Sequence, residues 1–311
     1  MPLDLVFCGT PPFAVPTLEK LVASGFRVHL VVTQPDRPKG RGLELVPSPV
    51  KESAAKLSLS ITQPDRIKIN DEFRTQLAAL RPDAIIVVGY GRLIPQWMLD
   101  LPPLGNINLH ASLLPKYRGA APVQWAIAQG ETITGVTTMR LDAGLDTGDI
   151  FLQQEIPIGS ADTLETLAPR LASIGADLMV ETLRGLQAGS IQPRPQDNSS
   201  ATLAPILKKE DGWVDFSRSA SEITNRIRGF QPWPGAYTKF RGKSLQILKA
   251  QLASEIFPPA ELHVQADRLF VGCGQNSSLE LLELQMEGKK RTSVRDFLHG
   301  YRPKPGEMLG S

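Results

Sequence analysis

Residues 3–33, LDLVFCGTPPFAVPTLEKLVASGFRVHLVVT, decide the fold class of this 311-residue chain. They predict an apolar strand from Leu3 to Cys8, a helix from Phe13 to Ala23, and a β-branched, apolar strand from Val28 to Thr33. Two strands joined through a helix form a parallel pair, because a tight turn cannot make such a crossover. The chain is therefore expected to begin with a β-α-β unit.

The alternation of strand and helix continues far into the chain. Strands are predicted at 84–88, 107–110, 136–141 and 150–156, and helices at 50–57, 72–80, 122–129 and 164–186. Ser48 followed by Pro49 is a typical cap and first-turn pair for the helix that enters at Val50. The fold class is therefore α/β, a Rossmann-like, mainly parallel sheet. In such sheets ligands bind beyond the carboxyl ends of the strands.

The pattern changes in the last third of the chain. Residues 190–207 lose periodicity and are rich in Pro, Ser and Gln, which predicts a linker. Beyond it come one helix, 220–230, and short strands that favour a small antiparallel barrel, at 236–240, 245–252, 262–266, 269–273 and 279–286. We therefore predict a first domain at 1–189, a linker at 190–207 and a second domain at 208–311.

Composition excludes several classes of protein. Cys8 and Cys273 are the only cysteines and form no Cys-x-x-Cys pair, which fits a reducing compartment. No apolar run approaches the ~18 residues of a membrane span, and the N-terminus enters a strand without a signal or transit segment. We expect a cytoplasmic protein without membrane contact. The formal net charge is only +2, but residues 205–311 hold 16 Lys and Arg against 12 Asp and Glu.

The loop after the first strand argues against a nucleotide-binding dehydrogenase. It reads Gly9-Thr10-Pro11-Pro12, without Gly-x-Gly-x-x-Gly. Two prolines remove two backbone N–H donors where a pyrophosphate needs them. The chain also lacks the Gly-x-x-x-x-Gly-Lys-Ser/Thr loop of nucleoside triphosphate sites. Dinucleotide binding is therefore not expected.

The most informative polar residues are Asn108, His110 and Asp146. Asn108 and His110 are two apart on a predicted strand, so their side chains share one face. Asp146 lies in the turn Asp142-Ala-Gly144-Leu-Asp146-Thr-Gly, and a loop there can return to that face. We expect its carboxylate to orient the imidazole and fix its tautomer. Each residue alone is more typical of an ordinary structural role.

The joint pattern is far more specific than its parts. Asn-x-His-x-Ser-Leu-Leu-Pro at 108–115, followed by Asp-x-Gly-x-Asp-Thr-Gly at 142–148, resembles the signature of the folate-dependent formyltransferases. The resemblance implies transfer of a formyl group from 10-formyltetrahydrofolate to an amine, with Asn108, His110 and Asp146 as catalytic residues. It implies no metal, and the four histidines show no ligand spacing.

The resemblance also implies a folate site against main chain. Ser112 is interpreted as a hydrogen-bonding turn residue rather than a nucleophile, and the glycines allow close backbone approach. Without the resemblance, these would be ordinary turn glycines after a strand. The candidate folate-binding residues are Val88, Gly89, Tyr90, Gly91, Ser112, Leu113, Leu114, Pro115, Asp142 and Gly144.

Three further segments resemble family members that act on methionyl-tRNA. These are the Gly- and Arg-containing loop at 33–51, Arg118-Gly119 with Pro122, and 227–236 in a C-terminal domain resembling the oligonucleotide-binding (OB) type of barrel. The loop departs from the pattern at Leu43-Glu44, where many relatives have lysines. The candidate tRNA-binding residues are Arg37, Lys39, Arg41, Lys208, Lys209, Lys289 and Lys290.

The implied partners are therefore initiator methionyl-tRNA and the folate co-substrate, and we expect a monomer. Three alternatives stay open: a formyltetrahydrofolate hydrolase, a formyltransferase for another amine, and an RNA-binding protein with a degenerate transferase domain. The intact Asn, His and Asp set argues against the last of these.

Overall fold

The computed structural model describes residues 2–39, 44–304 and 306–310. The chain divides into two compact units. The first contains residues 1–122, 133–157 and 168–204, and the second contains 123–132, 158–167 and 205–311. The last boundary falls within the predicted linker.

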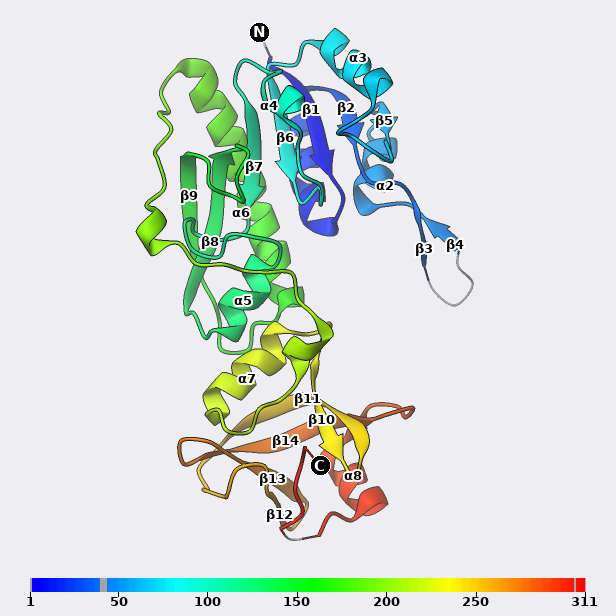
Figure 1. The fold of residues 1–311 in the computed structure, drawn as a ribbon, viewed down its shortest axis with the longest axis vertical. Coiled ribbons are helices and arrows are strands. Elements are labelled where there is room, and N and C mark those ends of the chain that lie inside the picture. Colours follow the sequence, from blue (N-terminus) through cyan, green and yellow to red (C-terminus); the bar gives the residue numbers. More distant parts are fainter. Residues whose placement is uncertain (1, 40–43, 305, 311) are drawn as a thin grey trace. The chain divides into compact units, whose positions relative to one another are not determined.

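The first unit is built on a seven-stranded sheet with the order β5-β2-β1-β6-β7-β8-β9 (Figure 1). The pairs from β5 to β7 are parallel, while β7–β8 and β8–β9 are antiparallel. The predicted mainly parallel sheet is therefore confirmed, with two antiparallel strands at one side. The strands are β1 Asp4–Gly9, β2 Arg27–Val32, β5 Ile61–Thr62, β6 Ala84–Val88, β7 Asn106–His110, β8 Ile133–Arg140 and β9 Ile150–Pro157.

The central strands are apolar because helices bury the sheet. All five residues of β6 are buried, as are the last five of β1, which is typical of parallel strands covered on both faces. The helical elements before and beside the sheet are η1 Pro12–Ala14, α1 Val15–Ala23, α2 Pro49–Lys56, α3 Asp71–Leu80, α4 Gln96–Leu99 and α6 Leu164–Ala188. The Ser48 cap is confirmed, since Lys51 N–H donates to Ser48 Oγ at 3.1 Å.

A short hairpin lies where sequence patterns predict only a loop. β3 (Arg37–Lys39) pairs with β4 (Glu44–Val46) in antiparallel fashion and projects from the sheet of the first unit (Figure 1). Three-residue strands interrupted by Pro38 carry too little alternation to be recognised. The connecting residues 40–43, which include the candidate Arg41, lie outside the described part of the chain.

The second unit holds a six-stranded antiparallel sheet with the order β10-β11-β14-β13-β12, and β15 pairs with β14. Within the described residues this order is an open path, since no ladder joins β10 to β12. The antiparallel prediction is confirmed, although helix α8 was not predicted. The elements are η3 Lys209–Gly212, α7 Ala220–Gly229, β10 Ala236–Phe240, β11 Lys243–Ala253, β12 Leu262–Gln265, β13 Arg268–Cys273, β14 Ser277–Met286, β15 Thr292–Ser293 and α8 Val294–Tyr301.

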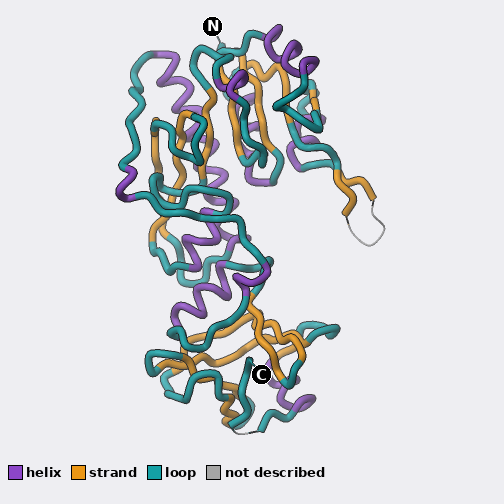
Figure 2. Tube along the Cα trace, in the orientation of Figure 1, coloured by secondary structure: helices purple, strands orange, loops and turns teal. Residues whose placement is uncertain are grey.

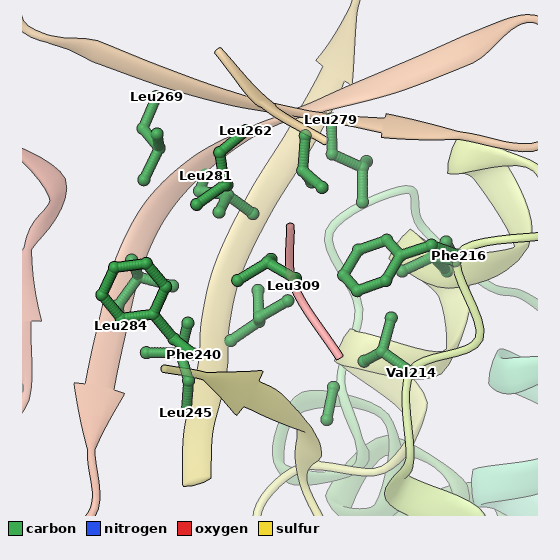
Figure 3. Packing of buried hydrophobic residues seen from close by; sticks show 14 of the residues in the cluster. Val214, Phe216, Phe240, Leu245, Leu262, Leu269, Leu279, Leu281, Leu284 and Leu309 are labelled. Carbon is green, nitrogen blue, oxygen red and sulfur yellow. The ribbon is translucent and has the colours of Figure 1, made fainter. Parts of the chain in front are cut away.

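Leucine and phenylalanine side chains fill the core of this sheet. Figure 3 shows Phe216, Phe240, Leu281 and Leu309 converging on one interior from strands and connecting segments. The amphipathic α8 adds Phe297, which is 1% exposed. The core therefore draws on residues from 214 to 309.

Helix α5 (Pro122–Ala128) packs in the second unit, although it lies between strands of the first. Gly229 of α7 permits this, because a Cβ there would lie 2.8 Å from the backbone nitrogen of Ala128. Trp125 completes the contact by meeting Phe230 edge-on, with ring centroids 5.3 Å apart. Across the described residues, no helix is both long and apolar enough to cross a membrane.

Candidate active site

Strand β7 carries two of the three predicted catalytic residues. Asn108 and His110 are two apart, and both are nearly buried, with 8% and 6% of their surface exposed. Asn108 is the ladder neighbour of Val87 in β6 and of Met139 in β8, so it lies well inside the sheet. Among the described residues, no group hydrogen-bonds the Asn108 side-chain amide. That amide can therefore offer an N–H to a bound molecule.

Each ring nitrogen of His110 has a polar neighbour, but only one of the two makes a hydrogen bond. Its Nε2 lies 2.8 Å from the carbonyl oxygen of Tyr117, and its Nδ1 lies 3.7 Å from Asp146 Oδ2. A carbonyl oxygen only accepts, so Nε2 carries the hydrogen and donates it to Tyr117. The prediction that Asp146 fixes the tautomer is wrong, because Tyr117 does so and 3.7 Å exceeds a hydrogen bond. The free Nδ1 position faces Asp146.

The loop from Leu141 to Asp149 returns Asp146 to the strand that carries His110. Leu141 N–H donates to Asn106 O beside the start of β7, and Asp146 then lies next to His110 at its end. Asp146 adopts a left-handed conformation with φ +52°, and its Oδ2 accepts from Gly119 N–H at 2.9 Å. The predicted meeting of Asp146 with His110 is therefore observed.

Earlier in the same loop, Asp142 closes a tight turn. Its Oδ1 accepts from Gly144 N–H at 3.0 Å and from Thr147 Oγ at 2.8 Å. A Cβ on Gly144 would approach Thr147 Oγ to 2.0 Å, so only glycine fits there. These contacts give both residues a structural role, and their proposed contact with folate stays a prediction.

The segment after β7 is fixed by hydroxyl groups. Ser112 Oγ donates to Lys116 O at 2.6 Å, which agrees with its interpretation as a turn residue. Thr137 of β8 donates to Ser112 O and accepts from Leu114 N–H. Leu114 is buried, whereas Leu113 and Pro115 are partly exposed. This loop therefore has a fixed shape beside His110.

The loop after β6 exposes backbone at two glycines. Gly89 and Gly91 are exposed and have φ of +55° and +76°, while Val88 and Tyr90 are buried. Tyr90 O accepts from Gln34 Nε2 at 2.8 Å, which anchors the loop. Burial raises the pKa of the Tyr90 phenol, whose hydroxyl has no hydrogen-bond partner among the described residues.

Two of the candidate folate segments share a hydrophobic cluster. Tyr90 and Val87 belong to it, and Leu141 packs against it from the start of the Asp146 loop. Leu141 also packs against a second cluster that contains Leu114. The folding of the first unit thus brings all three predicted folate segments around β7.

The candidate tRNA residues are distributed over both units. Arg37 is exposed on β3 and donates to Gln34 Oε1 at 3.0 Å. Lys39 ends the same strand, and Arg41 lies outside the described residues. The remaining candidates are exposed in the second unit: Lys208, Lys209, Lys289 and Lys290. Their contact with RNA stays a prediction.

Sequence reasoning missed the residues that surround Asp146. Tyr117 acts through its carbonyl and Gly119 through its N–H, and main-chain groups carry no residue-type signature. Gln196 donates from Nε2 to Asp146 O at 2.9 Å, yet it lies in the predicted linker. A polar residue that follows Pro195 in an aperiodic segment gives no signal of such a contact.

Comparison with known proteins matches both parts of the chain to family models. Residues 4–183 match "Formyl transferase" and residues 206–302 match "Formyl transferase, C-terminal domain". The methionyl-tRNA formyltransferase of Koribacter versatilis is 64% identical over 306 residues, covering 98% of each chain. That of Acidobacterium capsulatum is 60% identical, covering 99% of this chain and all of the relative.

Solved structures share the fold at lower identity. An N-formyltransferase from Helicobacter canadensis, in complex with folinic acid and dTDP-3-aminofucose, has a TM-score of 0.67 at 20% identity, covering 92% of this chain and all of that one. Methionyl-tRNA formyltransferase from Clostridium thermocellum has a TM-score of 0.57 at 18% identity, covering 81% of this chain and 94% of that one.

Proposed function

Because this chain belongs to the formyl transferase family, we propose that it transfers a formyl group to the α-amino group of methionyl-tRNA. Relatives at 46–64% identity that span nearly the whole chain carry that activity in their names. The product is the formylated initiator of translation. The observation that carries the proposal is Asn108 beside His110 on one strand face, with Asp146 Oδ2 3.7 Å from His110 Nδ1.

The donor in this proposal is 10-formyltetrahydrofolate, bound as a co-substrate. Family membership supports a formyl-folate, and the Helicobacter canadensis neighbour was solved with folinic acid. The exposed glycines 89 and 91 offer main chain for the pterin, and the Asp142 turn lies at the start of the loop that leads to Asp146. Isothermal titration with tetrahydrofolate tests this site independently of tRNA.

The reaction combines an attack, a build-up of negative charge and a proton transfer. The amine attacks the formyl carbon, negative charge gathers on the formyl oxygen, and the amine loses a proton before the folate nitrogen leaves. Asn108 has an N–H available for the developing oxyanion, a contribution of roughly 3 to 4 kcal/mol for a well-placed donor. Direct transfer needs no nucleophilic serine, which fits the commitment of Ser112 to its turn.

His110 can exchange a proton only at one ring atom. Nε2 is committed to Tyr117, so Nδ1 is the atom that gives a proton to the oxyanion or takes one from the amine. Asp146 stabilises the charged ring in either case, because its carboxylate faces the same nitrogen. The Tyr117 carbonyl keeps the ring in this orientation throughout.

For the tRNA, we propose contacts by Arg37 and Lys39 of the β3–β4 hairpin, by Arg41, and by exposed lysines of the second unit. Within the second unit, residues 205–311 hold 16 Lys and Arg against 12 Asp and Glu, and phosphates attract such basic segments. We further propose a monomer acting in the cytoplasm. Both described cysteines are buried and free, which suits a reducing compartment. Analytical ultracentrifugation tests the oligomeric state.

The decisive experiment offers the purified protein charged methionyl-tRNA and 10-formyltetrahydrofolate. Formylmethionine on the tRNA is the expected product, with release of tetrahydrofolate in equal amount. Formate release without formylated tRNA would instead identify a hydrolase. Formylation of another amine, with methionyl-tRNA left unchanged, would identify a different transferase.

A further inference from the structure

Residues 194–204, here called the strap, cross the two loops that complete the catalytic set (Figure 2). At one end Arg194 exchanges two backbone hydrogen bonds with Ile150, both 2.8 Å long. At the other, Arg118 N–H donates to Thr202 O at 2.9 Å, and Ala204 N–H donates to Arg118 O at 2.7 Å. The strap therefore joins the segment after β7 to the start of β9.

The side-chain amide of Gln196 makes the contacts that connect the strap to both loops. Its Nε2 donates to Asp146 O at 2.9 Å and to Gly148 O at 2.7 Å. Its Oε1 accepts from Arg118 Nε at 3.0 Å and from Arg118 Nη2 at 2.6 Å. Two N–H donors and two oxygen lone pairs are all that a carboxamide has. One side chain thus links the Asp146 loop to the loop that carries Tyr117.

Arg118 is also buried and held by hydrogen bonds to the strap. The residue is 7% exposed, and its Nη2 also donates to Asn198 Oδ1 at 2.8 Å. Its neighbour Tyr117 donates its N–H to Thr202 Oγ at 2.8 Å while its carbonyl accepts from His110. The strap therefore supports both partners of the imidazole, the Tyr117 carbonyl and the Asp146 carboxylate.

We propose that Gln196, together with Arg118, is a positioning residue that sets the distance between Asp146 and His110 Nδ1. Asp146 has a left-handed backbone, which is uncommon for a residue other than glycine, and the Gln196 bond to its carbonyl helps to hold this conformation. Neither residue is assigned a contact with substrate. The proposal rests on the formyl transfer proposed above, since it concerns the rate of that step.

The first test is Gln196→Ala. A misplacement of roughly 1 Å in catalytic geometry can cost about 10²-fold in rate, so we expect kcat to fall by about that factor. The KM values for methionyl-tRNA and for the formyl donor stay within about twofold, because the bound substrates are not touched. We also expect the pH dependence of kcat to move along the pH axis, because the carboxylate no longer faces Nδ1 at a fixed distance.

Gln196→Glu keeps the accepting oxygen of the side chain and removes its N–H donors. The carboxylate can still accept from Arg118, which keeps the strap folded, but it cannot donate to Asp146 O or Gly148 O. We expect a protein that still folds but loses at least as much kcat as Gln196→Ala, because a carboxylate oxygen now faces two carbonyl oxygens. Full kcat in a folded Gln196→Glu protein would overturn the proposal, because the donated bonds would then be irrelevant.

Asp197→Ala is the matched control. Asp197 is exposed, and among the described residues its carboxylate accepts only from Ser199 and Ser200 of the strap, so its loss disturbs the turn without reaching either loop. We expect wild-type kcat and pH profile. If Asp197→Ala lowered kcat as much as Gln196→Ala, general loosening of the strap would explain both, and the proposal would fall.

The wild-type protein is assayed first, so that failure of the proposed function is seen separately. If it releases formate or formylates another amine, the function proposed above is wrong. The same variants are then compared by the kcat of that reaction. A loss confined to KM for methionyl-tRNA would make the strap a tRNA contact and reject the positioning role.

Discussion

Replacement of Asp146 by asparagine removes one charge and little else. Asparagine Oδ1 can still accept from Gly119 N–H, so the loop keeps its anchor. The carboxylate lies 3.7 Å from His110 Nδ1, and the two side chains are 15% and 6% exposed. At an effective dielectric constant of roughly 20, opposite unit charges at that distance attract by about 4 kcal/mol. We therefore expect kcat to fall by up to about 10³-fold.

Single-turnover formylation of methionyl-tRNA measures this loss, with filter binding to check that affinity for the tRNA is unchanged. Asp100→Asn is the matched control: Asp100 is exposed at the end of α4 and accepts from Gln96, so it should keep full activity. An Asp146→Asn protein that retains a third or more of wild-type kcat would refute the role given to the charge.

Three further predictions concern other parts of the molecule. Asn108→Ala should lower kcat by about 10² to 10³-fold at unchanged melting temperature, because an oxyanion donor is lost; steady-state kinetics checks this. Replacing Lys289 and Lys290 by alanine should weaken tRNA binding and flatten the slope of log K against log salt by roughly 0.7 to 0.9 per lost phosphate contact, with folate affinity unchanged; an unaltered slope would remove them from the tRNA interface. Hydrogen bonding to Arg268 holds the pKa of Glu280 below its ordinary 4.5, so this pair stabilises the fold above about pH 4.5 and its contribution is lost as pH falls through the lowered value. Urea unfolding of Glu280→Gln should therefore show a smaller loss of stability than wild type between neutral and acidic pH.

The sequence by itself determined many of the helices and strands, and the strand face on which Asn108 and His110 lie. Short apolar runs place the strands β6 and β10 at their observed bounds, and Ser48-Pro49 marks the start of helix α2. The two-residue period of a strand is enough to put Asn108 and His110 on one face. These features are local, so each follows from residues within a few positions of one another.

Only the tertiary structure decided what surrounds those side chains. Tyr117 rather than Asp146 takes the ring N–H of His110, and Gln196 reaches Asp146 across 50 residues of chain. Helix α5 likewise packs against α7 because Gly229 leaves room for its backbone. Such contacts depend on main-chain carbonyls and on close approach of distant segments. A residue pattern does not encode them, because every residue has the same carbonyl and folding alone decides which one faces His110.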